Sequence, residues 1–327
     1  MNYRKKVTIL SVITGALALT YAALLVFSPD RIAARGAYYA WLEAGAAEQA
    51  DRIELGGGDP LNLVKRGGDW YAEYQGEEYP ARASRVEDLL AALSGREAYA
   101  LRGGSASAHE RLGLGEGSAA RIVLRRGVSG EVLLDLLAGN YDATGREVYY
   151  RKAGLDEVRS GSSRIMDFLS FSRASWYDLR LFPKGQDISL DRVSRVTVIP
   201  PAEGEAETLI LERDRQGWLV EGLPREDIDV SKIEPYIRTI LSAEGDDYIL
   251  PEGDDFSAGR IVLETAEGSL YIRLGAELPR ESDTAPVKRR ARVSPSERVL
   301  SLSSWTLSRL FQNRDYFSSP GGENQNP

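Results

Sequence analysis

The sequence SRASWYDLRLF at residues 172–182 is nearly repeated as SLSSWTLSRLF at residues 301–311. Six of the eleven positions are identical, including the two tryptophans, Trp176 and Trp305. A repeated functional motif would leave the intervening sequence unrelated, whereas a duplicated fold would repeat other features in the same order. The remaining sequence therefore distinguishes a repeated site from a repeated domain.

Four other features recur in the same order, which favours a duplicated domain. Each copy has a predicted hairpin with a tryptophan at the start of its return strand, then a helix, then a tyrosine, then a hairpin that opens with Arg-Ile-Val-Leu. These features lie at Trp70, 84–93, Tyr99 and 121–124, and again at Trp218, 231–240, Tyr248 and 260–263. Each copy is thus predicted to form one structural unit.

The two predicted helices are expected to begin with capping boxes. Ser84 precedes Glu87 by three residues, as Ser231 precedes Glu234, so each serine would accept a backbone N–H while each glutamate reaches back. Apolar residues then recur at helical spacing in both copies: Val86, Leu89, Leu90 and Leu93, and Ile233, Tyr236, Ile237 and Ile240. We expect each helix to pack one apolar face on a sheet.

The predicted fold class is α+β, with an N-terminal transmembrane helix followed by two tandem homologous modules, each an antiparallel sheet with packed helices. The modules are expected at residues 51–185 and 186–317. The repeated stretch would end each module, with Trp176 and Trp305 buried in the core. Residues 318–327 have no apolar pattern and are expected to form a disordered tail.

The amino terminus predicts a membrane anchor. Residues 7–27, VTILSVITGALALTYAALLVF, carry no charge and follow Arg4, Lys5 and Lys6. A helix of this length spans about 30 Å at about 1.5 Å per residue, which matches the hydrocarbon core of a bilayer. The cations favour a cytoplasmic amino end, so the body would lie outside the cytoplasm. Residues 1–28 are read as cytoplasmic tip and uncleaved anchor, with a cleaved signal peptide as the alternative, and residues 29–50 as a helical stalk.

The composition excludes several classes of site. The 327 residues contain no cysteine, one histidine and a net charge of −8. The lack of cysteine excludes disulfides, thiol nucleophiles and iron–sulfur clusters, and a single histidine excludes multi-histidine metal sites. The acidic balance disfavours nucleic acid as a partner, because such binding requires clustered Lys and Arg at phosphates.

Two clusters resemble catalytic or metal sites only weakly. His109 lies near Ser105 and Ser107 but without a G-x-S-x-G elbow, so we expect a histidine on a surface loop. Acidic turns at residues 244–247 and 252–255 carry four aspartates without the ligand spacing of a calcium loop. Solvated turns are the expected interpretation, and a Ca²⁺ site is the alternative.

Glycine and basic clusters complete the candidates. The glycines at residues 56–58 and 103–104 lack a phosphate-binding motif, and the first group predicts a hairpin turn. The basic run at residues 288–290, with Arg292, is expected on an edge strand, with contact to lipid headgroups or an acidic partner as the alternative. No catalytic, cofactor-binding or metal-binding residue is predicted, and no cofactor.

The ordered features resemble those of a bacterial family, the domain of unknown function 4340. The resemblance lies in the Trp70 hairpin, the helix at residues 86–93, the Leu112-Gly113-Leu114 turn before residues 121–124, and the hairpin that closes at Gly139. Asp229 matches an aspartate that often precedes the capped helix in the family, whereas Arg82 stands there in the first copy. Family members are commonly encoded near gliding-motility-type ABC transporter components, so the resemblance implies an auxiliary extracytoplasmic subunit and no catalytic residues.

The sequence therefore predicts a membrane-anchored, extracytoplasmic binding or scaffolding protein of an ABC-transporter-type envelope system, and not an enzyme. Its expected location is the inner cell membrane, crossed once. Its expected partners are the lipid bilayer and ABC transporter or other envelope protein subunits, without nucleic acid. Two alternatives stay open: a ligand-binding module that uses a groove between the repeats, and an enzyme acting on envelope polymers with carboxylates about 5–10 Å apart.

Overall fold

The computed structural model describes residues 14–17, 19–21, 38–57, 60–127, 130–170, 172–201, 207–250, 255–280 and 282–319. The chain divides into two units, Met1–Trp176 and Tyr177–Pro327. The boundary expected at residue 185 lies inside the second unit, because the backbone just before it pairs with that unit. Leu181 N–H donates to Ala243 O at 2.8 Å, and Gly245 N–H donates to Leu179 O at 2.8 Å.

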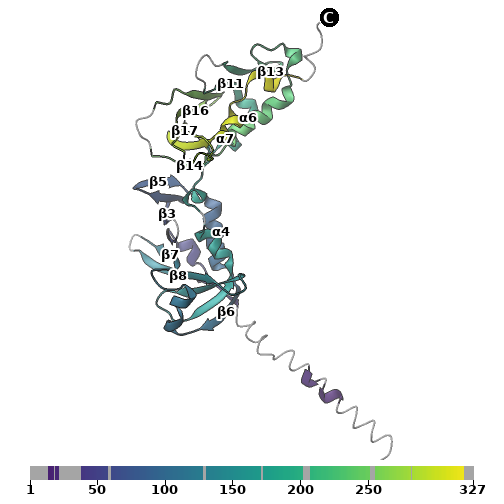
Figure 1. Cartoon of the computed structure of the whole chain (residues 1–327). Coiled ribbons are helices and arrows are strands. Elements are labelled where there is room, and N and C mark those ends of the chain that lie inside the picture. The colour runs from purple at the N-terminus through teal and green to yellow at the C-terminus, as the bar shows by residue number, and fades with distance from the viewer. Residues whose placement is uncertain are drawn as a thin grey trace, which may run out of the picture. The chain divides into compact units, whose positions relative to one another are not determined.

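The first unit is built on a ten-stranded sheet in which all pairs are antiparallel. The strands are β1 (Tyr38–Tyr39), β2 (Arg52–Gly56), β3 (Leu61–Arg66), β4 (Asp69–Tyr74), β5 (Glu77–Pro80), β6 (Glu97–Gly103), β7 (Ala120–Arg126), β8 (Glu131–Tyr141), β9 (Glu147–Lys152) and β10 (Val158–Ser162). Their order across the sheet is β1-β6-β10-β9-β8-β7-β2-β3-β4-β5 (Figure 1). In the part of this unit described from residue 38 onward, the α-helices are α3 (Ala46–Gln49), α4 (Ala83–Ser94) and α5 (Met166–Leu169).

The second unit is built on an eight-stranded antiparallel sheet. The strands are β11 (Val193–Ile199), β12 (Leu209–Asp214), β13 (Gly217–Val220), β14 (Asp247–Tyr248), β15 (Gly259–Thr265), β16 (Gly268–Glu277), β17 (Lys288–Val293) and β18 (Arg298–Ser303). Their order is β13-β12-β11-β15-β16-β17-β18-β14. The α-helices are α6 (Ile233–Leu241) and α7 (Ser304–Leu310), which lie beside the sheet in Figure 1.

The same strand order underlies both units once β1 and β5 are set aside. The order β4-β3-β2-β7-β8-β9-β10-β6 in the first unit corresponds to β13-β12-β11-β15-β16-β17-β18-β14 in the second. The register corresponds as well, since Arg121 of β7 pairs with β2 where Arg260 of β15 pairs with β11. Each unit also has a register shift after Ala138 or Leu274, next to Gly139 or Gly275. The two units are therefore copies of one topology.

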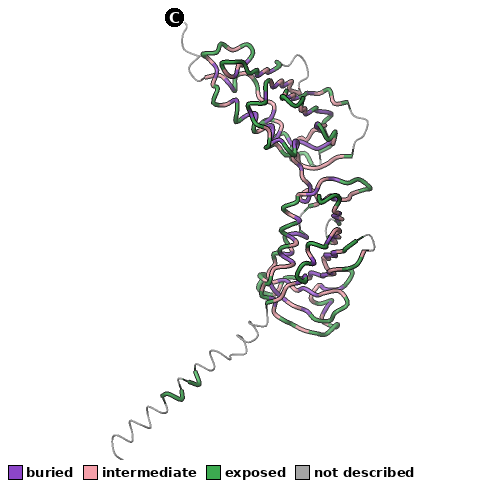
Figure 2. The backbone as a smooth tube through the Cα atoms, turned by 180° about the vertical axis from the view of Figure 1, so that it is seen from behind, coloured by how far each residue is buried: buried purple, intermediate pink, exposed green. Residues whose placement is uncertain are grey.

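Each unit buries its own core between the sheet and a helix. Val86, Leu89 and Leu93 of α4 are fully buried, as expected from their helical spacing. Ile237 and Ile240 of α6 are fully buried in the second unit. Figure 2 shows buried and exposed positions alternating along the strands, as expected when one sheet face is covered.

The predicted fold class is wrong in its membrane helix and in its balance of helix and sheet. None of the helices in the described part of the chain is long and apolar enough to cross a membrane. Of the predicted span, residues 14–17 and 19–21 are helical, and the others lie outside the described residues. Both units are mostly antiparallel sheet, because strands and not helices carry most of the buried apolar residues.

The described part of the predicted stalk belongs to the first unit. Residues 38–50 form β1 and the single turn α3 instead of a continuous helix. Trp41 is only 2% exposed, its backbone N–H donates to Leu93 O at 3.0 Å, and its ring meets Tyr99 edge-on at 5.1 Å. Burial of this tryptophan explains why the segment packs on the unit. Residues 29–37 of the stalk, and 320–327 of the predicted tail, lie outside the described residues.

The predicted capping boxes are wrong. Helix α4 begins at Ala83 with Arg82 as its N-cap, so Ser84 lies inside the first turn. In the second unit Asp229, and not Ser231, is the capping residue, and its carboxylate accepts the Ser231 backbone N–H at 3.2 Å. A 3₁₀ turn (Val230–Lys232) then leads into α6. Aspartate is as good a cap as serine, which accounts for the second unit, whereas no side chain caps α4 in the first.

The repeated tryptophans do not occupy equivalent positions. Trp176 is 2% exposed and ends a 3₁₀ turn (Arg173–Trp176), whereas Trp305 is 67% exposed at the start of α7. Helix α7 follows β18 as the turn η3 (Ser163–Ile165) and α5 follow β10, so α7 corresponds to residues before Trp176. The predicted burial of Trp176 is confirmed, and that of Trp305 is wrong.

The true counterpart of Trp176 is Phe317. Phe317 is 0% exposed and also ends a four-residue 3₁₀ turn, η9 (Arg314–Phe317). The carbonyl of Trp176 accepts the Arg82 N–H at 2.7 Å, and the carbonyl of Phe317 accepts the Asp229 N–H at 2.8 Å. Each unit therefore ends with a buried aromatic residue whose backbone is bonded at the entry to the main helix, to Arg82 before α4 or to Asp229 before the 3₁₀ turn that leads into α6.

Candidate binding groove

A groove of about 680 Å³ opens on the second unit. Three regions that are distant in the sequence line it: residues 182–188 together with Arg192, the turn between β15 and β16, and the turn between β17 and β18. This volume falls in the range of about 300–1,000 Å³ that small-molecule pockets occupy. The groove is thus large enough for a small ligand or a few residues of an extended peptide.

The groove has an apolar lining. Phe182 is 3% exposed, and Ile188 and Leu270 are half-buried. Pro183 and Pro295 are exposed at its rim. Leu270 pairs in register with Leu263, a fully buried residue, so the lining is continuous with the core of the unit. Ligand contact here would remove apolar surface from water, which favours binding.

Backbone hydrogen bonds fix the walls of the groove. Gly185 N–H donates to Phe182 O at 2.8 Å, and Ile188 N–H donates to Gly185 O at 3.2 Å. A Cβ at Gly185 would lie 2.2 Å from Leu241 O, so only glycine allows this close approach to the end of α6. Next to the lining residue Pro295, the Ser294 hydroxyl accepts the Tyr271 N–H at 2.7 Å. The groove is therefore formed before any ligand binds.

Charged side chains surround the apolar lining. Arg192 forms an ion pair with Glu267, and Arg192 O accepts the Ala266 N–H at 3.1 Å. Lys184 and Asp187 also line the groove and are exposed. Within the described residues, no ion pair joins Lys184 to a carboxylate. The rim therefore offers one cation to a ligand while its floor is apolar.

The sequence predicts a surface histidine at position 109, and this prediction is wrong. His109 is only 8% exposed. Its Nε2 atom lies 3.1 Å from the Asp156 carbonyl oxygen. Ser105 and Ser107 bond to each other at 2.8 Å, and among the described residues neither serine contacts the imidazole. The histidine thus helps to hold the loop before β7, and the described contacts form no catalytic triad.

The acidic turns and glycine clusters are local structural elements where they are described. Among the described residues, no group of three or more acidic or histidine side chains is placed to hold a metal ion. Residues 251–254 of the second acidic turn lie outside the described part of the chain. Leu55 pairs with Leu61, which confirms the hairpin predicted at the first glycine cluster, although Gly58 itself is not described.

The basic run does not lie on an edge strand. Residues Lys288–Val293 form β17, which pairs with β16 on one side and β18 on the other. The Arg289 guanidinium bonds the Glu277 carboxylate at 2.7 Å, and the Arg292 guanidinium lies 4.1 Å from the centre of the Phe256 ring. Apolar Ala291 and Val293 alternate with the arginines and enter the core, which is why the strand is internal.

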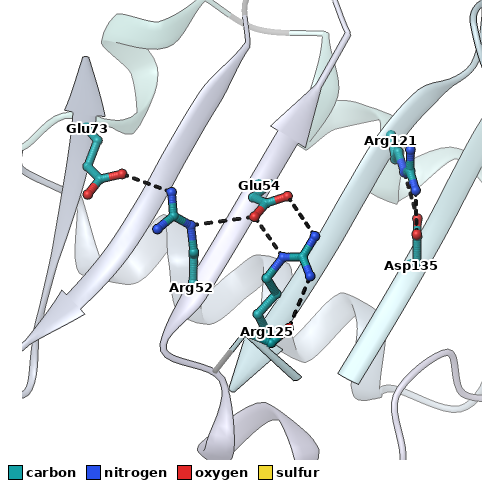
Figure 3. A network of polar contacts seen from close by, with 7 residues as sticks. Arg52, Glu54, Glu73, Arg121, Arg125 and Asp135 are labelled. Carbon is teal, nitrogen blue, oxygen red and sulfur yellow. Dashed lines mark hydrogen bonds and ion pairs between the residues drawn. The ribbon is translucent and has the colours of Figure 1, made fainter. Parts of the chain in front are cut away.

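A charged network covers part of one sheet face in the first unit (Figure 3). Two pairs join neighbouring strands: Arg125 bonds Glu54 at 2.8 Å, and Arg121 bonds Asp135 at 2.7 Å through Nε. A third pair, Arg52 of β2 with Glu73 of β4 at 3.3 Å, reaches across β3. The bond to Asp135 raises the pKa of Arg121 above its usual value. Each of these arginines is neutralised by a carboxylate, so the network stabilises strand pairing and leaves little charge for a ligand.

The groove was not predictable from the sequence, because its lining comes from segments that are distant along the chain. The segment at Pro183 had the composition of a linker, and nothing in it indicates contact with the turn after β15. The one usable signal was the apolar character of Phe182 beside a proline and a glycine.

Comparison with known families places the chain in a family. The model of the family described as "Domain of unknown function (DUF4340)" matches residues 70–259, more than half of the chain. The match begins in β4 and ends at the first residue of β15, so it crosses from the first unit into the second. No curated protein and no solved structure matches the chain.

Proposed function

The chain belongs to the DUF4340 family, as its resemblance to that family predicted, and from this premise we propose that it is a binding or scaffolding protein. In this proposal the groove of the second unit holds an apolar segment of a partner protein. The observation that carries the proposal is the preformed apolar lining at Phe182, Ile188 and Leu270. A preformed groove lowers the entropy lost on binding, which suits a docking role.

We propose that the partner is a subunit of an ABC-transporter-type envelope system. The support for this partner is the resemblance described from the sequence, and the groove supplies the chemistry of contact. An extracytoplasmic location of the two units stays a prediction, in keeping with a sequence that has no cysteine. A reporter enzyme active only outside the cytoplasm, fused after Ser319, would test that location.

Site-specific photo-crosslinking tests the docking role. A photoreactive residue at position 188, within the groove, should yield one major crosslinked partner in cells of the source organism. The matched control is position 230, where Val230 is 56% exposed in the same unit but does not line the groove. Equal crosslinking at both positions, or none at position 188, would count against the groove as a docking site.

A small apolar ligand is the second candidate for the same groove, and the observation in its favour is the volume of about 680 Å³. Native mass spectrometry of the purified protein distinguishes the two candidates. A co-purified mass that is lost in Ile188→Asp favours the small ligand. A protein crosslink without such a mass favours docking.

A further inference from the structure

Three arginines lie side by side on the sheet of the second unit. Arg260 of β15 pairs in register with Arg273 of β16, and Arg273 pairs with Arg292 of β17. Residues paired across antiparallel strands share one face, with Cβ atoms about 4.5–5.5 Å apart. Ile261 and Ile272, which adjoin Arg260 and Arg273 along their strands, are fully buried. The arginine row therefore lies on the face opposite the core.

Among the residues that the structure describes, the three guanidinium groups have no carboxylate partner. Like charges directly opposite each other destabilise a sheet, and neighbouring carboxylates usually offset this cost. No ion pair joins any of the three arginines to a carboxylate in the part of the chain that the structure describes. Arg260 and Arg273 are exposed, and Arg292 is half-buried. This positive row stands out in a chain whose net charge is −8.

Aromatic rings hold two of the arginines in place. The Arg273 guanidinium lies 4.4 Å from the centre of the Tyr271 ring, and the Arg292 guanidinium lies 4.1 Å from that of Phe256. The Tyr271 hydroxyl donates to the Glu297 carboxylate, which fixes that ring. Stacking orders a guanidinium without neutralising it, and its N–H groups stay available to an anion.

The first unit shows that the fold does not require this row. The equivalent residues there are Arg121, Leu137 and Arg151, by the same strand pairing. Arg121 is paired with Asp135, and Leu137 is buried in a cluster with Leu114. Arg151 is 6% exposed and donates to the Leu114 carbonyl at 3.1 Å. The equivalent row is thus ion-paired or buried in the first unit, whereas in the second unit it is open to solvent.

We infer that the row of Arg260, Arg273 and Arg292 binds a linear anion that carries several phosphate groups. Guanidinium groups bond phosphate oxygens in a bidentate manner, and three groups at a spacing of about 5 Å present donors over about 10 Å. A single phosphate engages only part of the row, whereas a chain of phosphates engages all of it. The row lies outside the lining of the groove, so this inference does not rest on the proposed function.

Titration of the purified full-length protein with inorganic polyphosphate tests the inference. Polyphosphate should bind at least about tenfold more tightly than orthophosphate, and Arg273→Gln should weaken it about tenfold or more, since charged hydrogen bonds are lost. The matched control is Arg121→Gln, the equivalent arginine of the first unit, which should leave affinity unchanged. The slope of log affinity against log salt should fall by about one for each row arginine removed.

Two further binding measurements distinguish lipid headgroups from a soluble chain as the source of the phosphate groups. Binding to phosphatidylglycerol vesicles that Arg273→Gln abolishes would identify headgroup phosphates as a source, and binding to polyphosphate alone would identify a soluble chain. Arg273→Lys, which keeps the charge, should retain part of the affinity. Absence of binding to both probes, or equal losses in Arg121→Gln and Arg273→Gln, would overturn the inference. Circular dichroism of each variant shows that it is folded.

Discussion

At the scale of single residues, identity in a short stretch did not mean equivalence in the fold. Trp176 and Trp305 stand in stretches that share six of eleven residues, yet one ring is 2% exposed and the other 67%. Phe317, whose sequence neighbours differ from those of Trp176, takes the equivalent buried position. The backbone hydrogen bond to Arg82 or to Asp229, at the entry to the main helix, sets this position. No side-chain motif in the sequence indicates it.

The two tryptophans should differ in their contribution to stability. Trp176→Ala should lower the free energy of unfolding by about 3–5 kcal/mol, because it removes a large buried ring. Trp305→Ala should change it by no more than about 0.5 kcal/mol, as is usual for exposed positions. Urea unfolding followed by circular dichroism measures both. Equal effects of the two substitutions would contradict the assignment of Phe317 as the counterpart.

Asp142 should titrate far below an ordinary aspartate. Backbone N–H groups of Glu147 and Arg146 and the Thr144 hydroxyl bond its carboxylate and lower its pKa to about 2. Because the folded pKa is depressed, this stabilising contribution is present above the unfolded pKa of 3.8 and is lost as the pH falls through about 2. NMR titration measures the pKa directly, and Thr144→Val should raise it. An unchanged pKa in that variant would show that the hydroxyl bond does not contribute.

At the scale of elements, apolar spacing predicted the buried faces of the helices and strands correctly, but not how helices begin or where loops pack. Val86, Leu89 and Leu93 are buried as expected, while the caps at Ser84 and Ser231 are not formed as predicted. Local spacing reports which face meets a core, whereas a cap depends on the entering backbone. The lining of the groove and the arginine row depend on contacts and register between segments far apart in sequence, which no local pattern encodes.

Gly139, the one glycine of β8, should be sensitive to substitution. A Cβ there would lie 2.3 Å from Leu112 O, so the loop before β7 must move if a side chain is added. Gly139→Ala should lower the free energy of unfolding by about 1–3 kcal/mol, as overpacking does. Hydrogen exchange should rise at residues 110–115 in particular.

The equivalent Gly275 provides the comparison. A Cβ there would lie 3.1 Å from Asp255 O, a milder contact. Gly275→Ala should therefore cost less than Gly139→Ala. A larger loss of unfolding free energy in Gly275→Ala than in Gly139→Ala would show that the loop near Gly139 moves at little cost.

At the scale of the whole molecule, the duplication was readable from the order of weak sequence features, because each feature belongs to one element of a repeated sheet. Trp70 and Trp218 both begin a return strand, and Arg121 and Arg260 have the same place in the strand order. The division at Trp176 was not predictable, because it falls inside the stretch at residues 172–182 and no linker marks it.

The two units should unfold independently, because each has its own core. Leu89→Ala in α4 and Ile237→Ala in α6 each remove a fully buried side chain and should each cost about 2–5 kcal/mol. We expect hydrogen exchange to increase only in the unit that carries the substitution. Loss of protection in both units from either substitution would show that they unfold together.

The exposure of Trp305 also makes the protein its own optical probe. The chain has five tryptophans, and Trp41, Trp70, Trp176 and Trp218 are each no more than 8% exposed. A water-soluble collisional quencher such as iodide should therefore reach the indole of Trp305 and leave the emission of the other four nearly intact. Any partner that covers α7 would reduce this quenching, so the start of that helix can be watched without attaching a label.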